Sequence, residues 1–284
     1  MASPKKSILV TGGNSGIGLA LCKLLATEHG CHVFLGSRDE ARGAKALATI
    51  AEAHPGAAVE VVQIDVASDA SVQAAAAAVA KSGKKLYAVV NNAGIGLAQP
   101  NAEAKDTAAI VNTNFRGPRR VVDAFADLVT HRIVNVSSGV ASMWLRDQDA
   151  ATKALFSDPA LTMAALDAAV AKEVAAGNVG MGNGYGVSKA ALTALTLVQA
   201  RAHPSLTVTS LSPGFIVTPM TQGYGAKLSP EEGCVSSLKC LFGDVASGHY
   251  YGSDGLRSPL TCTRDPGTPE YGGEADPDPA KYNK

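Results

Sequence analysis

Short apolar runs alternate with longer alanine-rich segments along most of this chain. The short runs are rich in Val, Ile and Leu, a composition that favours β-strands, whereas alanine is the strongest helix former. Strands are expected at 8–10, 33–35, 59–62, 86–90, 133–136 and 206–211, and helices at 17–28, 40–53, 69–81, 104–128 and 185–201. Regular alternation of this kind predicts an α/β fold, a doubly wound parallel sheet with helices on both faces.

Two regions interrupt the alternation. Residues 141–184 contain two helix-like pieces, at about 147–156 and 162–176, and are expected to form a helical insertion. Residues 252–284 form a C-terminal tail whose last part is rich in Pro, Gly, Asp and Glu, so it is expected to be mobile or loosely packed. A length of 284 residues with 46% apolar residues suits one large core, and a single domain over 1–251 is expected.

Composition and charge exclude several classes of partner. The 25 basic and 25 acidic residues cancel, so no long-range field attracts nucleic acid or an anionic membrane, and small molecules are the expected partners. Five cysteines without CxxC spacing argue against a disulfide framework or a zinc site, and no metal is expected. Without an apolar signal region or a run of membrane-spanning length, we expect a cytoplasmic location.

A glycine-rich turn follows the first expected strand and leads into the first expected helix. It reads Thr-Gly-Gly-Asn-Ser-Gly-Ile-Gly at positions 11–18. Glycine permits positive φ and lets the backbone approach a pyrophosphate, whose charge then meets the amide groups and the positive dipole of the helix N-terminus. In this context the motif predicts a dinucleotide site, with these candidate contacts: Gly12, Asn14, Ser15, Gly16, Ile17 and Gly18.

The end of the second expected strand indicates which dinucleotide binds. NAD-binding folds place an acidic residue there for the ribose 2′-hydroxyl, but this chain has Ser37 and Arg38, with Arg42 one helical turn later. Two guanidinium groups suit a 2′-phosphate, because each charge-assisted hydrogen bond contributes roughly 1.5–3 kcal/mol. NADP(H) is therefore favoured over NAD(H). Asp39 tempers this argument, since its carboxylate can pair with either arginine.

Further candidates follow the third and fourth expected strands. Asp65 and Val66 are expected at the adenine, and Asn92, Ala93 and Gly94 along the other side of the cofactor. Ligands bind at the carboxyl ends of strands in open α/β sheets, which raises these residues above plain caps and turns.

Tyr185 and Lys189 open the last expected helix at a spacing of four, which places both side chains on one helix face. A tyrosine has an ordinary pKa of about 10, whereas acid–base catalysis works best near neutral pH. A lysine charge ~4 Å away contributes about 4 kcal/mol, or roughly three pK units, and is expected to bring the pKa of Tyr185 near 7. Taken alone, such a pair is more often a surface pair.

Ser138 ends the fifth expected strand and offers a hydroxyl for a substrate carbonyl. The six histidines are scattered away from this edge, so a nucleophilic serine is not expected. Within the long helix, Pro118 lacks an N–H and leaves the carbonyl of Asn114 without its helical partner. A water held there would make Asn114 a proton relay to Lys189; the alternative is a kinked helix with no catalytic part.

Taken in order, these motifs, together with a Pro-Gly-xxx-Thr segment at 213–218, resemble the short-chain dehydrogenase/reductase family across residues 7–251. The resemblance implies a Rossmann-type catalytic domain that transfers hydride between the nicotinamide C4 and a carbonyl or alcohol carbon. It also implies a catalytic tetrad, namely Asn114, Ser138, Tyr185 and Lys189. The segment that holds the nicotinamide carboxamide in the family corresponds here to Pro213, Gly214, Ile216 and Thr218.

Within that family, the residues around the expected 2′-phosphate and the long gap between Ser138 and Tyr185 are most similar to NADPH-dependent carbonyl reductases. The resemblance implies reduction of a ketone, aldehyde or quinone, and a monomer, because the insertion covers the helix surface that relatives use to dimerise. Apolar residues expected near the substrate suggest hydrophobic bulk: Leu97, Val140, Trp144, Phe215, Met220 and Tyr224. Two alternatives stay open, an NADP-dependent alcohol or hydroxysteroid dehydrogenase and a non-catalytic NADP(H)-sensing protein.

Overall fold

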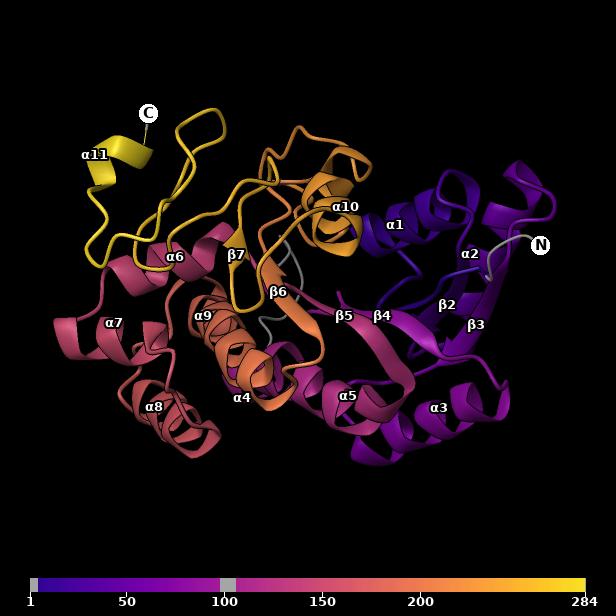
Figure 1. The fold of residues 1–284 in the computed structure, drawn as a ribbon, viewed down its shortest axis with the longest axis horizontal. Helices are drawn as coiled ribbons and strands as arrows, with labels where there is room; N and C mark the ends of the chain where they lie inside the picture. The colour runs from indigo at the N-terminus through magenta and orange to yellow at the C-terminus, as the bar shows by residue number, and fades with distance from the viewer. Residues whose placement is uncertain (1–4, 98–105, 284) are drawn as a thin grey trace.

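A parallel sheet of seven strands runs through the centre of the computed structural model, which describes residues 5–97 and 106–283 (Figure 1). The strands are β1 Ser7–Val10, β2 His32–Ser37, β3 Val59–Gln63, β4 Leu86–Asn91, β5 Val129–Val136, β6 Thr207–Leu211 and β7 Tyr250–Tyr251. Their order is β3-β2-β1-β4-β5-β6-β7. The six expected strands are confirmed, and β7 is a further one. The order reverses between β1 and β4, and this switch point is where ligands bind in doubly wound sheets.

Helices cover both faces of the sheet, as the alternation predicts (Figure 1). One apolar cluster packs the helices α1 Gly16–Thr27, α2 Glu40–Ala53 and α10 Val235–Phe242 against one face. A second cluster packs α3 Asp69–Lys81 and α5 Gly117–Phe125 against the other. The long helix α9 Met181–Ala202 lies beside β6, and η3 Glu232–Cys234 is a short 3₁₀ turn before α10. None of the helices in the described ranges combines the length and apolar character of a membrane span.

The helix expected at 104–128 is divided in the structure; its first two residues lie outside the described part of the chain. It comprises α4 Thr107–Val111, a π-helical segment η1 Asn112–Arg116, α5, and a 3₁₀ turn η2 Ala126–Leu128. Pro118 is the second residue of α5 and cannot donate a hydrogen bond to the carbonyl of Asn114. Proline is a usual cause of irregularity in a helix, and here the irregularity is a single π-helical segment directly before α5. The expected irregularity is confirmed, whereas the water relay stays a hypothesis.

The insertion forms three helices, α6 Gly139–Arg146, α7 Ala150–Ser157 and α8 Met163–Ala175. The last two confirm the expected pieces, while α6 is additional. The helix expected at 147 begins at 150 because the carboxylate of Asp149 accepts a hydrogen bond from the N–H of Thr152 and caps α7. A third apolar cluster joins all three helices to α9, and within it Trp144 packs on Phe156 with ring centroids 5.4 Å apart.

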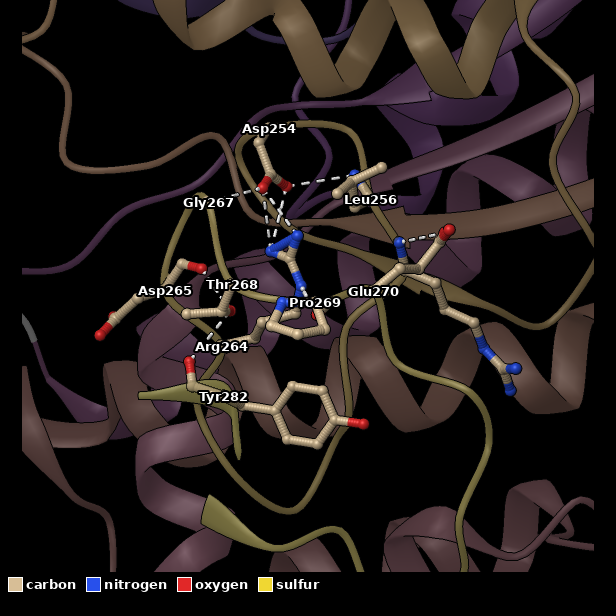
Figure 2. Close-up of polar contacts among 10 residues, drawn as sticks. Asp254, Leu256, Arg264, Asp265, Gly267, Thr268, Pro269, Glu270 and Tyr282 are labelled. Atoms are coloured by element: carbon tan, nitrogen blue, oxygen red, sulfur yellow. Dashed lines mark hydrogen bonds and ion pairs between the residues drawn. The ribbon is translucent and has the colours of Figure 1, made fainter. Parts of the chain in front are cut away.

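The first part of the C-terminal tail, up to residue 265, is packed, so the expectation of a loosely packed segment is wrong there, while most residues from 266 to 281 are exposed. The side chain of Arg264 is fully buried and pairs with Asp254 at 2.7 Å (Figure 2). Its Nε–H also donates to the carbonyl of Pro269. The tail ends in the short helix α11 Pro279–Tyr282, whose Tyr282 is fully buried. Composition alone misses this arrangement because a buried ion pair, rather than a run of apolar residues, organises the segment.

Replacing Arg264 by Ala is expected to destabilise the protein by about 3 kcal/mol, because removing one partner of a buried pair leaves an uncompensated carboxylate. Urea denaturation followed by circular dichroism measures the change. Arg146→Ala removes an exposed pair with Asp147 and serves as the control, with no measurable loss expected. Equal midpoints for the wild type and Arg264→Ala would show that the pair does not hold the tail.

Candidate active site

A cleft with a volume of about 620 Å³ crosses the carboxyl ends of the strands at the switch point. Every residue predicted to bind the cofactor lines it, from the glycine turn to Thr218. Ser138 lines it as well, whereas Asn114 is buried beneath it. Segments far apart in the sequence therefore meet in one continuous groove. Within the described residues, no group of three or more His, Cys, Asp or Glu side chains is arranged to hold a metal ion.

The glycine turn has the geometry that a pyrophosphate requires. Gly12 and Gly16 have φ values of +66° and +52°, a region that favours glycine. A β-carbon at Gly18 would lie 2.3 Å from the carbonyl oxygen of Gly12 and 2.4 Å from Nδ2 of Asn92, so only glycine fits. The first turn of α1 carries no acidic residue, and Ser15 caps it without a side-chain hydrogen bond. The N-terminus of α1 is therefore open to an anion.

At the carboxyl end of β2, Ser37, Arg38 and Arg42 line the same cleft. Asp39 caps α2 by accepting a hydrogen bond from the N–H of Arg42 at 2.8 Å. Its second carboxylate oxygen lies 3.7 Å from Nε of Arg42, so Asp39 pairs with Arg42 and not with Arg38. Both side chains of this pair are exposed, and such pairs contribute little to stability. Arg42 can therefore turn toward a phosphate at a small cost in free energy. Arg38 lines the same cleft.

Tyr185 and Lys189 lie side by side on α9, with Nζ of Lys189 5.6 Å from the centre of the tyrosine ring. Both side chains are buried, and the Lys189 ammonium donates a hydrogen bond to the carbonyl of Val136 at 2.8 Å. The backbone of Gly96 is in close contact with the tyrosine ring and leaves no room for a side chain, since a β-carbon there would be 2.2 Å from Cδ2 of Tyr185. Lys189 and Gly96 thus both lie against the ring of Tyr185. The alternative that Tyr185 and Lys189 form only a surface pair is wrong.

The pKa of Tyr185 differs from the sequence expectation. Burial raises the pKa of this phenol to about 12, and its hydrogen bond with Ser138 lowers it only in part. Burial also lowers the pKa of Lys189 to about 8. The expectation that Lys189 brings the pKa of Tyr185 near 7 is wrong, because it counted the lysine charge and left out the cost of burying a phenolate. At neutral pH, Tyr185 is protonated and Lys189 is charged.

Asn114 connects two walls of the site. Its side-chain oxygen accepts a hydrogen bond from the N–H of Ile95 at 2.8 Å, and its Nδ2 donates to the carbonyl of the same residue at 2.7 Å. Nδ2 also donates to the hydroxyl of Ser188, on the helix that carries Tyr185. Asn114 therefore fixes the segment after β4 against α9, an arrangement that the relay hypothesis did not include.

Some of the apolar residues expected near the substrate line the cleft, and the others do not. Leu97 and Met220 line the cleft, together with Ile95 and Pro219, which were not predicted. Trp144 instead belongs to the core, where its indole N–H donates to the carbonyl of Asn178. The remaining candidates do not line this cleft: Val140, Phe215 and Tyr224.

Ser137 is a site residue that sequence reasoning missed. It lines the cleft, and its hydroxyl donates to the carbonyl of Lys189 at 3.0 Å and contacts the hydroxyl of Thr193 at 2.7 Å. The strand β5 is thereby tied to α9 at the level of the lysine. The position beside Ser138 is the only signal in the sequence, and it does not distinguish this role from a plain strand end.

Known proteins resemble this chain in sequence and in fold. The family model for short chain dehydrogenases matches residues 6–164. A (+)-neomenthol dehydrogenase from Arabidopsis thaliana is 34% identical over 266 residues, which cover 81% of this chain and 89% of that protein. Salutaridine reductase from Papaver somniferum superposes with a TM-score of 0.78 at 26% identity, covering 87% of this chain and 99% of the reductase. NADPH-bound carbonyl reductase from chicken fatty liver has a TM-score of 0.66 at 28% identity, covering 90% and 99%.

Proposed function

This chain belongs to the short-chain dehydrogenase family of oxidoreductases, and from that membership we propose that it reduces an uncharged carbonyl compound with NADPH. One observation carries the proposal. A single cleft has two arginines and Ser37 at one end and Ser138, Tyr185 and Lys189 at the other, with the glycine turn between them. The chicken carbonyl reductase was solved with NADPH, which supports the choice of cofactor.

Each polar side chain at the catalytic end of the cleft has a separate role in the reduction. When bound, NADPH supplies the hydride for the carbonyl carbon. Ser138 donates a hydrogen bond to the carbonyl oxygen, and Tyr185, protonated at neutral pH, donates the proton to that oxygen. Lys189 stabilises the phenolate that remains and returns a proton to it. Asn114 holds the segment after β4 in position against α9, the helix that carries Tyr185.

The substrate end of the cleft favours an apolar ketone, aldehyde or quinone. Ile95 and Leu97, on either side of Gly96 at the tyrosine ring, line the cleft, as does Met220. Pro219 lines it beside Gly16 of the glycine turn, and the charged residues other than Lys189 come from the cofactor end. Apolar walls with a few convergent polar groups are typical of sites for small uncharged ligands.

The proposal is tested by following NADPH oxidation at 340 nm with a panel of apolar ketones, aromatic aldehydes and quinones, and with NADH in parallel. We expect turnover of at least one class with NADPH, and slower turnover with NADH. NADPH binding without turnover across the panel would favour the sensing protein instead. A reaction that proceeds only from an alcohol with NADP would favour the oxidative dehydrogenase.

The rate of reduction is expected to fall above pH 8. Because burial lowers the pKa of Lys189 to about 8, its ammonium is present below that pH and is lost above it. The phenol of Tyr185 stays protonated over the same range. A profile of kcat from pH 6 to 10 should be flat at first and then decline by up to tenfold per pH unit. Lys189→Arg, whose charge persists, should remove the decline, and a decline that survives this change would contradict the assignment.

A further inference from the structure

Ser212 lies directly before the cleft-lining segment 213–218 but does not line the cleft itself. It is 8% exposed, and its hydroxyl oxygen lies 3.0 Å from the amide nitrogen of Gly139 and 3.4 Å from that of Gly214. Its own N–H donates to the carbonyl of Tyr251 at 2.8 Å, and its carbonyl accepts a hydrogen bond from the hydroxyl of Ser236. One buried serine therefore contacts α6, β7, α10 and the cleft segment.

The bond to Gly139 matters because Gly139 is the first residue of α6 and Ser138 is its N-cap. The N–H groups of the first helical turn have no partner within the helix. Ser138 accepts from one of them, the N–H of Val140 at 3.2 Å. Ser212 accepts from the preceding one. The backbone that carries the hydroxyl of Ser138 is thus held by a side chain that directly follows the neighbouring strand β6.

Tyr250 extends the same contact. The residue is 4% exposed, and its phenol forms hydrogen bonds with the hydroxyls of Ser212 and Ser142. Burial raises the pKa of the phenol, and these two hydrogen bonds oppose that rise. Ser142, also on α6, donates to the carbonyl of Pro259 in the tail at 3.3 Å. The tail turn beside this strand contains the Asp254–Arg264 pair (Figure 2). Two successive turns of α6 are therefore tied to β7 and the tail.

We propose that Ser212 is a positioning residue that fixes the N-terminus of α6, and with it the hydroxyl of Ser138, relative to the segment 213–218. The inference rests on the proposed function of Ser138. A catalytic group that is displaced by about 1 Å can lose up to 10²-fold in rate, so loss of the bond to Gly139 is expected to lower turnover. The contact with Gly214 is longer, at 3.4 Å, so cofactor binding is expected to change little.

Ser212→Ala tests the proposal, and Ser237→Ala is its matched control. Ser237 is also buried, on α10, but its hydroxyl has no hydrogen-bond partner among the residues that the structure describes. We expect kcat to fall about tenfold in Ser212→Ala, with the Kd for NADPH from fluorescence titration within threefold of wild type. In the protein without cofactor, hydrogen exchange of the peptide 137–146 should become faster. Ser237→Ala should change none of these values.

Two further variants keep the test decisive if Ser212→Ala folds poorly. Ser212→Thr retains the hydroxyl and should restore most of kcat. Tyr250→Phe removes a hydrogen-bond partner of Ser212 while leaving the serine in place, and it should speed exchange of 137–146. Unchanged kcat and exchange in Ser212→Ala, or equal losses in Ser237→Ala, would overturn the proposal. Because exchange needs no turnover, faster exchange in a protein that reduces no carbonyl would reject the proposed function while leaving the structural tie intact.

Discussion

Tyr185→Phe is expected to lower kcat for carbonyl reduction about a thousandfold. The variant keeps the ring that packs against Gly96 and removes only the hydroxyl, so the proton donor is lost without a cavity. Proton transfer by a positioned side chain contributes typically 10²–10⁴-fold to rate. Steady-state kinetics with NADPH, together with the Kd for NADPH, separate the loss of chemistry from a loss of binding, and the Kd should stay within threefold of wild type.

The control is Tyr87→Phe, which removes a half-buried hydroxyl that donates to the carbonyl of Leu241. It should retain kcat within twofold. A Tyr185→Phe protein that turns over at more than a tenth of the wild-type rate would show that another group, or water, supplies the proton.

A double change of Arg38 and Arg42 to Ala is expected to reduce kcat/KM for NADPH about 100-fold and to leave kcat/KM for NADH within threefold. Two charge-assisted hydrogen bonds to a 2′-phosphate contribute roughly 3 kcal/mol together when their exposure is taken into account. The two values come from initial rates with each cofactor at saturating carbonyl substrate.

Lys45→Ala is the matched control, because this exposed cation on α2 does not line the cleft. Its effect on either cofactor should be less than twofold. Equal losses with NADPH and NADH in the double variant would mean that the arginines do not recognise the 2′-phosphate.

The hydrophobic pattern predicted most of the fold because each strand and helix has a strong local signal. The helices at 40–53 and 69–81 agree with the structure at both ends, and the side chains of Asp39 and Ser68 cap them where they begin. The strand β7 was missed because two residues are too few for a pattern. The tail was misjudged because the burial of Arg264 depends on Asp254, a contact that composition does not reveal.

The site was predictable where a motif has a fixed place on a strand end, and less so where long-range packing decides. All predicted cofactor residues meet in one cleft because parallel strands deliver their carboxyl ends to the same edge. The pKa of Tyr185 was misjudged because burial is a tertiary property. Ser212 carries no sequence signal, since its role depends on a bond to Gly139 73 residues away. A monomeric state and a cytoplasmic location stay predictions.

The central claim is that this protein reduces a carbonyl carbon with hydride from NADPH. The most direct test incubates the protein with NADPH deuterated at C4 of the nicotinamide and an apolar ketone from the panel, and analyses the alcohol by mass spectrometry. One deuterium on the carbinol carbon, from only one of the two C4 epimers of the labelled cofactor, is the predicted result. Absence of alcohol, or alcohol without deuterium from either epimer, would contradict the account.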